Sequence, residues 1–320
     1  MKFKNSKSIN FSDVNLLSEK ISLVEHRDDV LFENNRLIVA PMSALQNSVF
    51  NSAAISIGLS LQIHRFCSIE DQHQALHEAV AIKTLFQSKS LIWLCVGLND
   101  YKKRIDPIYQ FLQDNQIGIL FDVANGYSTH VGNTLKAFNA SYELPNTMTG
   151  NVHAWSGFEY LERLESKFIR VGIGNGLACE TSNRTGIARG QISAIVDIVD
   201  KLHSANLVSD GGIRSPADVA KAFGAGADYV MMGSVFAQAS ESESQKTGVF
   251  YGGASSMQKE KMGTNRNKYV EGKELHIEQS DTSLLEIVTN ISDGIKSAIS
   301  YSGYIDLESF IGNGIFEINQ

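Results

Sequence analysis

The sequence has few cysteines and no spacing that would pair them. Cys67, Cys95 and Cys179 are the only three in 320 residues, and they form no CxxC pair. A disulfide framework is excluded, because such frameworks need several cysteines at regular spacings. A structural zinc site is not expected either, since no histidine-rich segment accompanies the cysteines. Free thiols fit a reducing compartment.

The chain also lacks an excess of positive charge and a long apolar run. The formal net charge is −7, which argues against a nucleic-acid surface, because such a surface shows as a basic patch or stripe. The longest apolar run, near Leu91–Leu98, is far shorter than the roughly 20 residues of a membrane span. The basic N-terminus is followed by polar residues, where a secretory signal would be apolar. We expect a soluble, cytoplasmic protein that binds neither nucleic acid nor membranes.

What the chain does contain is a regular series of short apolar runs separated by helix-length stretches. Apolar residues make up 43% of the chain, enough for a sizeable core. Eight runs are typical of buried parallel strands, at 37–40, 59–63, 91–96, 117–121, 147–149, 168–171, 206–209 and 229–232. Eight strand–helix repeats predict an α/β fold, a (β/α)8 TIM barrel that forms a single catalytic domain over residues 1–320. A doubly wound sheet is the alternative, but it does not need eight strands.

Two helix starts and one weakly patterned segment are visible between these runs. Ser215 precedes Pro216 and Asp218, and Ser68 precedes two acidic residues, so both serines are candidate N-caps. The segment from about 246 to 278 is polar, glycine-bearing and weakly periodic. We therefore expect a mobile or irregular active-site segment there, because long irregular loops are often functional.

The stretch from Gly172 to Thr181 combines three glycines with a lone thiol. It follows the sixth apolar run, and its glycines let the backbone turn tightly and approach a ligand closely. A glycine-rich turn with free N–H groups also favours the thiolate that a nucleophilic Cys179 requires. The alternative is a phosphate-binding loop followed by an inert, buried cysteine.

In a (β/α)8 barrel the active site is built where the strands end. The predicted strand ends carry Pro41-Met42, His64-Arg65, Gly97, Asp122, Gly150-Asn151, Asp210-Gly211-Gly212 and Gly233-Ser234, together with the thiol loop. Glycines at the sixth, seventh and eighth ends predict a phosphate site made of backbone N–H groups, with Ser234 opening a short helix.

Several long motifs resemble the IMP dehydrogenase/GMP reductase family. They are Asp122–Ser128 (DVANGYS), Val171–Cys179, Ser209–Gly212 and Asp218–Asp228 (DVAKAFGAGAD). The similarity runs from Asn10 to Gly303, and the first motif resembles GMP reductases specifically. A second point of resemblance to GMP reductases is that the chain lacks the paired regulatory (CBS) insert that most IMP dehydrogenases carry.

The resemblance implies NADPH-dependent reductive deamination of GMP, or of a close guanine nucleotide such as dGMP, to IMP and ammonia. Cys179 would attack the purine C2 and ammonia would leave, which gives a covalent thioimidate that hydride from the nicotinamide resolves. Thr181, with Glu271 as its partner, would deliver the proton that the leaving ammonia needs. Without the resemblance, Glu271 is a solvated loop carboxylate.

The resemblance also implies binding roles. Asp210 would accept hydrogen bonds from the ribose hydroxyls. The phosphate and the base would be bound by Gly174, Gly176, Gly211, Gly212, Gly233, Ser234, Ser255, Ser256 and Lys268. Arg65 and Asp122 would lie near the nicotinamide and the proton network, with Gly97 and Asn125 also on the cofactor side; an ion pair that only stabilises the barrel is the alternative for the first two. The carbonyls of Gly174, Gly176 and Cys179 could hold potassium, and relatives are usually homotetramers.

Five residues depart from the family pattern and cluster around the purine and its phosphate. Leu177 replaces a usual serine, Arg65 a lysine, Glu180 a threonine and Ala254 a methionine, and Lys268 falls near a usual arginine. The identity of the nucleotide is therefore left open. The competing hypotheses are an IMP dehydrogenase that oxidises IMP with NAD⁺, a catalytically silent nucleotide-binding barrel, and a flavin-dependent reductase.

Overall fold

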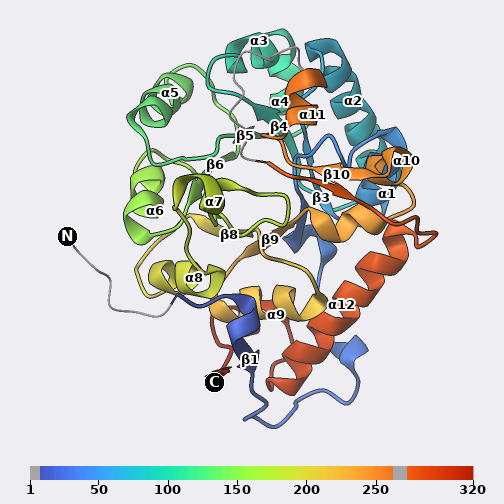
Figure 1. The fold of residues 1–320 in the computed structure, drawn as a ribbon, viewed down its shortest axis with the longest axis vertical. Helices are drawn as coiled ribbons and strands as arrows, with labels where there is room; N and C mark the ends of the chain where they lie inside the picture. Colours follow the sequence, from blue (N-terminus) through green and yellow to red (C-terminus); the bar gives the residue numbers. More distant parts are fainter. Residues whose placement is uncertain (1–7, 262–271, 320) are drawn as a thin grey trace.

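The computed structural model describes residues 8–261 and 272–319. Eight parallel strands close into a barrel in chain order, with the last strand beside the first (Figure 1). They are β2 (Leu37–Val39), β3 (Ser60–Ile63), β4 (Ile92–Val96), β5 (Gly118–Phe121), β6 (Thr147–Val152), β7 (Phe168–Val171), β8 (Asn206–Asp210) and β9 (Tyr229–Met232). The eight predicted strands and the predicted TIM barrel are thus confirmed.

Most of the helices form an outer layer around the strands (Figure 1). The helices of the chain in the described residues are α1 (Ser48–Ser56), α2 (Ile69–Leu85), α3 (Tyr101–Ile105), α4 (Tyr109–Asp114), α5 (Thr129–Asn139), α6 (Trp155–Glu162), α7 (Thr181–Thr185), α8 (Gln191–Val199), α9 (Pro216–Ala225), α10 (Glu243–Thr247), α11 (Ser256–Lys261), α12 (Leu284–Tyr301) and α13 (Leu307–Phe310). The short 3-10 turns are η1 (Phe11–Asp13), η2 (Arg27–Asp29), η3 (Asn34–Arg36), η4 (Asp106–Ile108) and η5 (Ser234–Gln238). A loop and then a helix follow each of the first seven barrel strands in the chain. Because the eight strands are parallel, the loops at their carboxyl ends share one rim.

Alternation along the strands divides the core into two layers. Successive strand residues point to opposite faces of the sheet. In β7, Phe168 belongs to the cluster that fills the barrel interior, whereas Ile169 and Val171 pack between the sheet and the helices. The interior cluster is Ile38, Ala40, Trp93, Cys95, Leu120, Met148, Phe168, Val208 and Met231. The barrel is therefore a packed core, and a ligand can bind only at its rim.

The predicted helix starts are confirmed by their hydrogen bonds. Ser68 Oγ accepts from the Asp71 N–H at 3.0 Å at the start of α2. Ser215 Oγ accepts from the Asp218 N–H at 3.3 Å at the start of α9, with Pro216 as the first helical residue. Each serine satisfies an N–H group that has no partner inside the helix.

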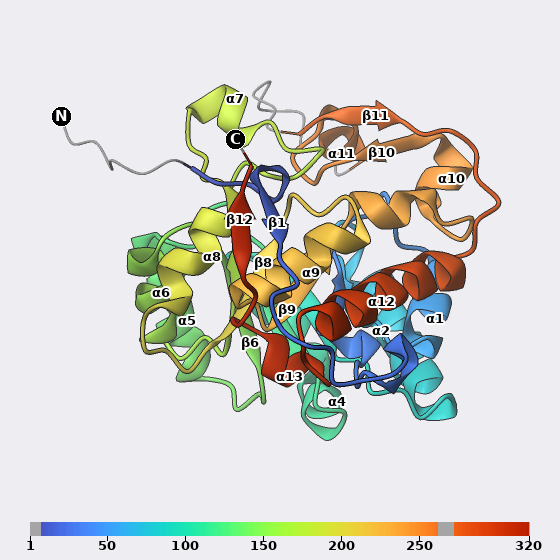
Figure 2. The same ribbon diagram turned by 90° about the horizontal axis from the view of Figure 1, so that it is seen from below.

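Outside the barrel, two antiparallel strand pairs fasten the ends of the chain and the rim. β1 (Val14–Leu16) pairs with β12 (Phe316–Ile318), which joins the N-terminal arm to the C-terminus. β10 (Val249–Tyr251) pairs with β11 (Glu274–His276), and Figure 2 shows this pair on the same side of the barrel as α7. The segment over 246–278, expected to be mobile or irregular, thus contains β10, α11 and β11 among its described residues, and its role at the active site stays a prediction. Phe250 and Tyr251 are buried, and strands of three residues are too short to show a period.

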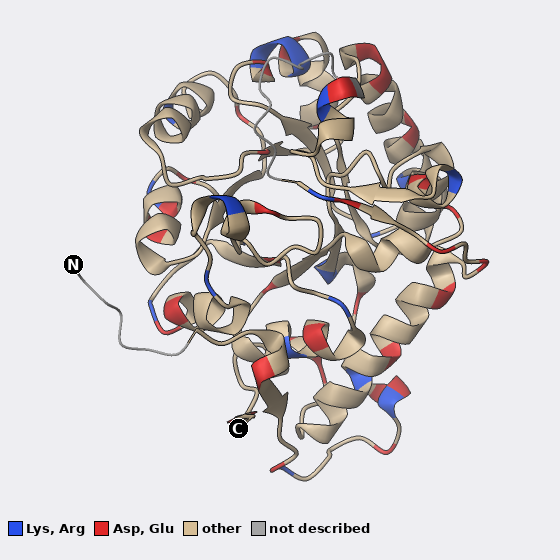
Figure 3. Cartoon of the chain, viewed as in Figure 1, with Lys and Arg blue, Asp and Glu red and all other residues tan. Residues whose placement is uncertain are grey.

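Figure 3 marks the positions of basic and acidic residues, and the two kinds are interspersed along the outer helices in this view. None of the helices in 8–261 and 272–319 combines the length and the apolar character that crossing a membrane requires.

We predict that replacing Ser68 with alanine lowers the free energy of unfolding by about 1 kcal/mol, because the Asp71 N–H then loses its cap. Ser68→Gly is the matched control and should cost only about a few tenths of a kcal/mol, since glycine leaves that N–H open to water. Urea denaturation of the two variants measures the difference, and equal losses would show that the serine does not act as a cap.

Candidate active site

A cavity of about 530 Å3 opens at the carboxyl ends of the barrel strands. Its wall is contributed by the loops after seven of the eight strands and by the segment around β10. Eleven of the residues assigned to the site from the sequence line it: Arg65, Asp122, Gly174, Gly176, Cys179, Thr181, Asp210, Gly211, Gly212, Gly233 and Ser234. Residues from five strand ends, far apart in the chain, are thus brought to one cavity.

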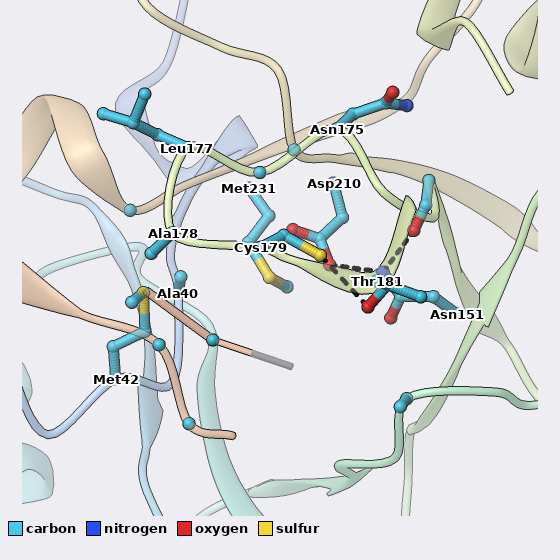
Figure 4. Close-up of a pocket in the computed structure, with 18 of the residues that line it drawn as sticks. Ala40, Met42, Asn151, Asn175, Leu177, Ala178, Cys179, Thr181, Asp210 and Met231 are labelled. Atoms are coloured by element: carbon cyan, nitrogen blue, oxygen red, sulfur yellow. Dashed lines mark hydrogen bonds between the residues drawn. The ribbon is translucent and has the colours of Figure 1, made fainter. Parts of the chain in front are cut away.

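The thiol loop depends on a close approach of two backbones. Gly172 has a φ of +141°, and a Cβ on it would lie 2.0 Å from the Asp210 carbonyl oxygen. No other residue fits there, because even alanine would overlap that atom and would be strained at this φ. The loop then turns over the rim and ends at Cys179, which is partly exposed and lines the cavity (Figure 4).

The side chain of Cys179 has a polar neighbour in its own loop, and its backbone has a partner in the segment before β11. Its Sγ lies 3.2 Å from Thr181 Oγ1. Cys179 also forms an isolated antiparallel bridge with Gly272, and the Lys273 N–H donates to the Ala178 carbonyl at 2.9 Å. The sulfur therefore faces the cavity at a fixed position in the loop instead of packing in the aliphatic core.

A lysine offsets the negative charge that Glu180 places beside the thiol. Lys273 Nζ lies 3.1 Å from Glu180 Oε1. The hydrogen bond from Lys273 lowers the pKa of the Glu180 carboxyl, so the carboxylate stays ionised and paired near neutral pH. This ion pair also ties the start of β11 to the thiol loop.

The phosphate end of the cavity is made of glycines from three strand ends. Gly211 and Gly212 both have positive φ, +96° and +81°, which glycine adopts without strain. Gly233 is the N-cap of η5, and Ser234 begins that turn as predicted. Backbone N–H groups at such turns can donate to an anion.

Arg170, which the sequence did not single out, and Asn151, which it placed at a strand end without a role, connect the carboxylates of the site. Arg170 donates from Nη1 to Asp122 Oδ1 at 3.1 Å, and from Nε and Nη2 to Asp210 Oδ2 at 3.1 and 2.9 Å. Asn151 Nδ2 donates to the same Asp210 oxygen at 2.7 Å, and Arg65 Nε lies 3.4 Å from Asp122 Oδ2. A charged residue inside an otherwise apolar strand was the available signal for Arg170.

Burial and charge oppose each other at Arg170. Burial alone would lower the pKa of the guanidinium, but the carboxylates of Asp210 and Asp122 more than compensate, so the pKa of Arg170 is raised. The group is therefore a permanent cation held between two anions.

Apolar side chains cover the wall facing the thiol. Ala40, Met42 and Met231 come from the first and last barrel strands or the loop after them, and Phe250 comes from β10. Figure 4 shows Met231, Asp210 and Cys179 among the residues that line the cavity. An apolar wall beside convergent polar groups is the usual composition of a small-molecule site.

Four described residues assigned from the sequence, Gly97, Asn125, Ser255 and Ser256, do not line this cavity. The Gly97 N–H donates to Asp100 Oδ1, Asn125 Oδ1 accepts from the Tyr127 N–H, and Ser255 Oγ accepts from the Gln258 N–H. Ser256 begins α11, away from the wall. Each of the first three polar groups is thus used in a local turn or cap. Lys268 and Glu271 lie outside the described residues.

The residues that line the cavity fit a nicotinamide cofactor, whereas they give little support to a cation site. Arg65, Phe66 and Val123 also line the cavity, and they offer a cation and apolar surface to a nicotinamide nucleotide. At the predicted potassium site, the Gly176 carbonyl already accepts from the Cys179 N–H at 3.0 Å. Residues 8–261 and 272–319 contain no group of three or more His, Cys, Asp or Glu that could hold a metal ion. Potassium stays a prediction.

Comparison with known proteins finds one family along nearly the whole chain. A family model described as "IMP dehydrogenase / GMP reductase domain" matches residues 8–317. The chain is 29% identical to GMP reductase of Caenorhabditis elegans over 337 residues, which cover 98% of this chain and 93% of that protein. It is 30% identical to human GMP reductase 1 over 340 residues, which cover 96% and 94% of the two chains. Human GMP reductase 2 is also 30% identical, over 95% of this chain and 92% of its own length.

The three thiols should differ sharply in reactivity. Burial raises the pKa of Cys67 to about 11, and Cys95 is completely buried. We therefore predict that Ellman's reagent at pH 8 modifies one thiol per folded chain, that Cys179→Ala removes this reaction, and that all three thiols react in denaturant. Rapid modification of a second thiol in the folded protein would contradict the assignment.

Proposed function

The chain belongs to the IMP dehydrogenase/GMP reductase family of NAD(P)-dependent oxidoreductases that bind purine nucleotides, and from that premise we propose that it is a GMP reductase. The proposed reaction is the NADPH-dependent reductive deamination of GMP, or of a close guanine nucleotide such as dGMP, to IMP and ammonia. The supporting observation is the Cys179 thiol, which lines the same cavity as the glycines of three strand ends and lies 3.2 Å from the Thr181 hydroxyl.

Cys179 would divide a difficult displacement into two easier steps. Its sulfur would form a bond to the purine C2, and the bond from C2 to the amino group would break as ammonia leaves. When bound, NADPH supplies a hydride to the same carbon. The bond between C2 and the sulfur would then break, which releases IMP and returns Cys179 as the thiolate. The apolar wall of Met42 and Met231 would hold the base and exclude water, which protects the thioimidate from hydrolysis.

Thr181 is positioned to move a proton beside the thiol. Its Oγ1 lies at hydrogen-bond distance from Sγ, so one hydroxyl can both receive the thiol proton and approach the leaving amino group. Glu271 is the proposed partner of Thr181. That assignment rests on the family resemblance and on chain position, because Glu271 directly precedes Gly272, which is bridged to Cys179.

The remaining residues would orient the nucleotide. The backbone N–H groups around Gly212, Gly233 and Ser234 would bind the 5′-phosphate, and Asp210 would bind the ribose. Asp210 Oδ2 is already held by Arg170 and Asn151, whereas Oδ1 receives no hydrogen bond from any residue that the structure describes. Oδ1 is therefore the oxygen available to a hydroxyl. Arg65 and Asp122 would lie on the cofactor side.

The first test compares two cysteine variants. We predict that purified protein oxidises NADPH only in the presence of GMP or a close analogue, and that Cys179→Ala lowers kcat by at least about 1,000-fold while GMP still binds. Cys67→Ala is the matched control and should keep wild-type turnover, because Cys67 does not line the cavity. The readout is loss of nicotinamide absorbance together with ammonia release.

Three outcomes would contradict this proposal. Normal turnover in Cys179→Ala would exclude the covalent step. Reduction of NAD⁺ with IMP, and no oxidation of NADPH with GMP, would instead support an IMP dehydrogenase. Nucleotide binding with no turnover in any combination would support a silent barrel.

The second test concerns the proton relay. Glu271→Gln keeps the size of the side chain but removes its charge, so we predict that kcat for deamination falls by about 100-fold, within the usual contribution of acid–base groups. Steady-state kinetics with GMP measures the change, and an unaltered kcat would remove Glu271 from the mechanism.

A further inference from the structure

Arg170 lies between the two carboxylates of the site, and the proposed reaction gives it no task of its own. Its side chain is only 10% exposed, and its three guanidinium nitrogens are all used: Nη1 on Asp122, Nε and Nη2 on Asp210. Phe168, two residues earlier, fills the barrel interior, so strand alternation points Arg170 into the barrel mouth. One guanidinium thus joins a group on the cofactor side to a group on the nucleotide side.

The connection extends one residue beyond each carboxylate. Arg65 lies against the second oxygen of Asp122, and Asn151 donates to the oxygen of Asp210 that Arg170 holds. The order Arg65, Asp122, Arg170, Asp210 alternates positive and negative charge and is neutral in sum. Within the described residues, the Asn151 side-chain oxygen is buried without a hydrogen-bond partner, although Asn151 lines the cavity.

We propose that Arg170 is a positioning residue that couples nucleotide binding to cofactor binding. The inference rests on the proposed function, because it takes Asp210 to meet the ribose and Asp122 to face the cofactor. A ligand that fixes one carboxylate fixes the guanidinium and, through it, the other carboxylate. The second ligand then meets groups that are already ordered and loses less conformational entropy on binding.

A purely structural role predicts something different. If Arg170 only neutralised two buried carboxylates, its replacement would lower stability and could weaken each ligand separately. It would leave unchanged the factor by which one ligand alters the affinity of the other. That factor, measured as a ratio of dissociation constants, separates the two explanations and is the same whichever ligand is titrated.

The experiment uses a pair of ligands that cannot react, GMP and NADP⁺, because NADP⁺ has no hydride to donate. Isothermal titration calorimetry on the full chain gives the Kd of GMP with and without saturating NADP⁺. We expect NADP⁺ to lower the Kd of GMP by about five-fold or more in the wild type. The reverse titration should give the same factor.

Three variants identify the group responsible. Arg170→Gln keeps a hydrogen-bond donor but loses the positive charge and the planar guanidinium that reaches both carboxylates. The coupling factor should therefore fall below about two. Arg170→Lys keeps a cation between the carboxylates and should restore part of the factor. Arg189→Gln is the matched control, because Arg189 is also partly buried and paired, to Asp197 at 2.8 Å, but does not line the cavity. Its coupling factor should equal that of the wild type.

Full coupling in a folded Arg170→Gln protein would overturn the inference. If this variant does not fold, as judged by its melting curve, Asp122→Asn weakens the same connection from the other side, and full coupling there would equally contradict it. Turnover of GMP by a wild type whose two ligands bind independently would overturn the coupling and leave the proposed function intact. Failure of the wild type to bind GMP would contradict both.

Discussion

The close contact between Gly172 and the end of β8 is the constraint on which the rest of the site depends. The backbone at Gly172 passes so near the Asp210 carbonyl that a single added carbon would overlap it. Because the chain can pass there, the loop after β7 leans over the barrel mouth instead of away from it. Cys179 and the ribose-binding candidate Asp210 therefore share one cavity although they come from different strands.

Electrostatics within the cavity are balanced locally, on a chain whose formal net charge is −7. Two arginines and two aspartates alternate across the rim, and Glu180 beside the thiol is paired with Lys273. Removing any one of these two arginines and two aspartates would leave a partly buried charge uncompensated, which costs more than the pair contributes. The phosphate end is different, because its candidate donors are backbone N–H groups of glycine turns and need no side-chain cation.

The departures from the family pattern have different structural settings. Leu177 is partly exposed at the cavity, where it offers an apolar side chain and no hydroxyl to a phosphate. Glu180 points to Lys273 and so forms part of the link between the thiol loop and β11. Ala254 lines the cavity with a small side chain. The altered positions therefore bear on the fit of the nucleotide more than on the thiol and its hydroxyl neighbour.

The sequence by itself determined the barrel, because eight buried runs at strand–helix spacing and the caps at Ser68 and Ser215 are local signals that survive in the fold. It also determined the glycine turns at 172–176 and 211–212, since positive φ values select glycine whatever the tertiary context. Only the tertiary structure decided that Arg170 and Asn151 join Asp122 and Asp210, because these contacts span 40 to 59 residues of chain and depend on closure of the sheet. The tertiary structure also decided that the Ser255 hydroxyl caps a helix, because a local cap and a bound ligand compete for the same polar group. It decided that β10 and β11 pair as well, because strands of three residues are too short to show a period in the sequence.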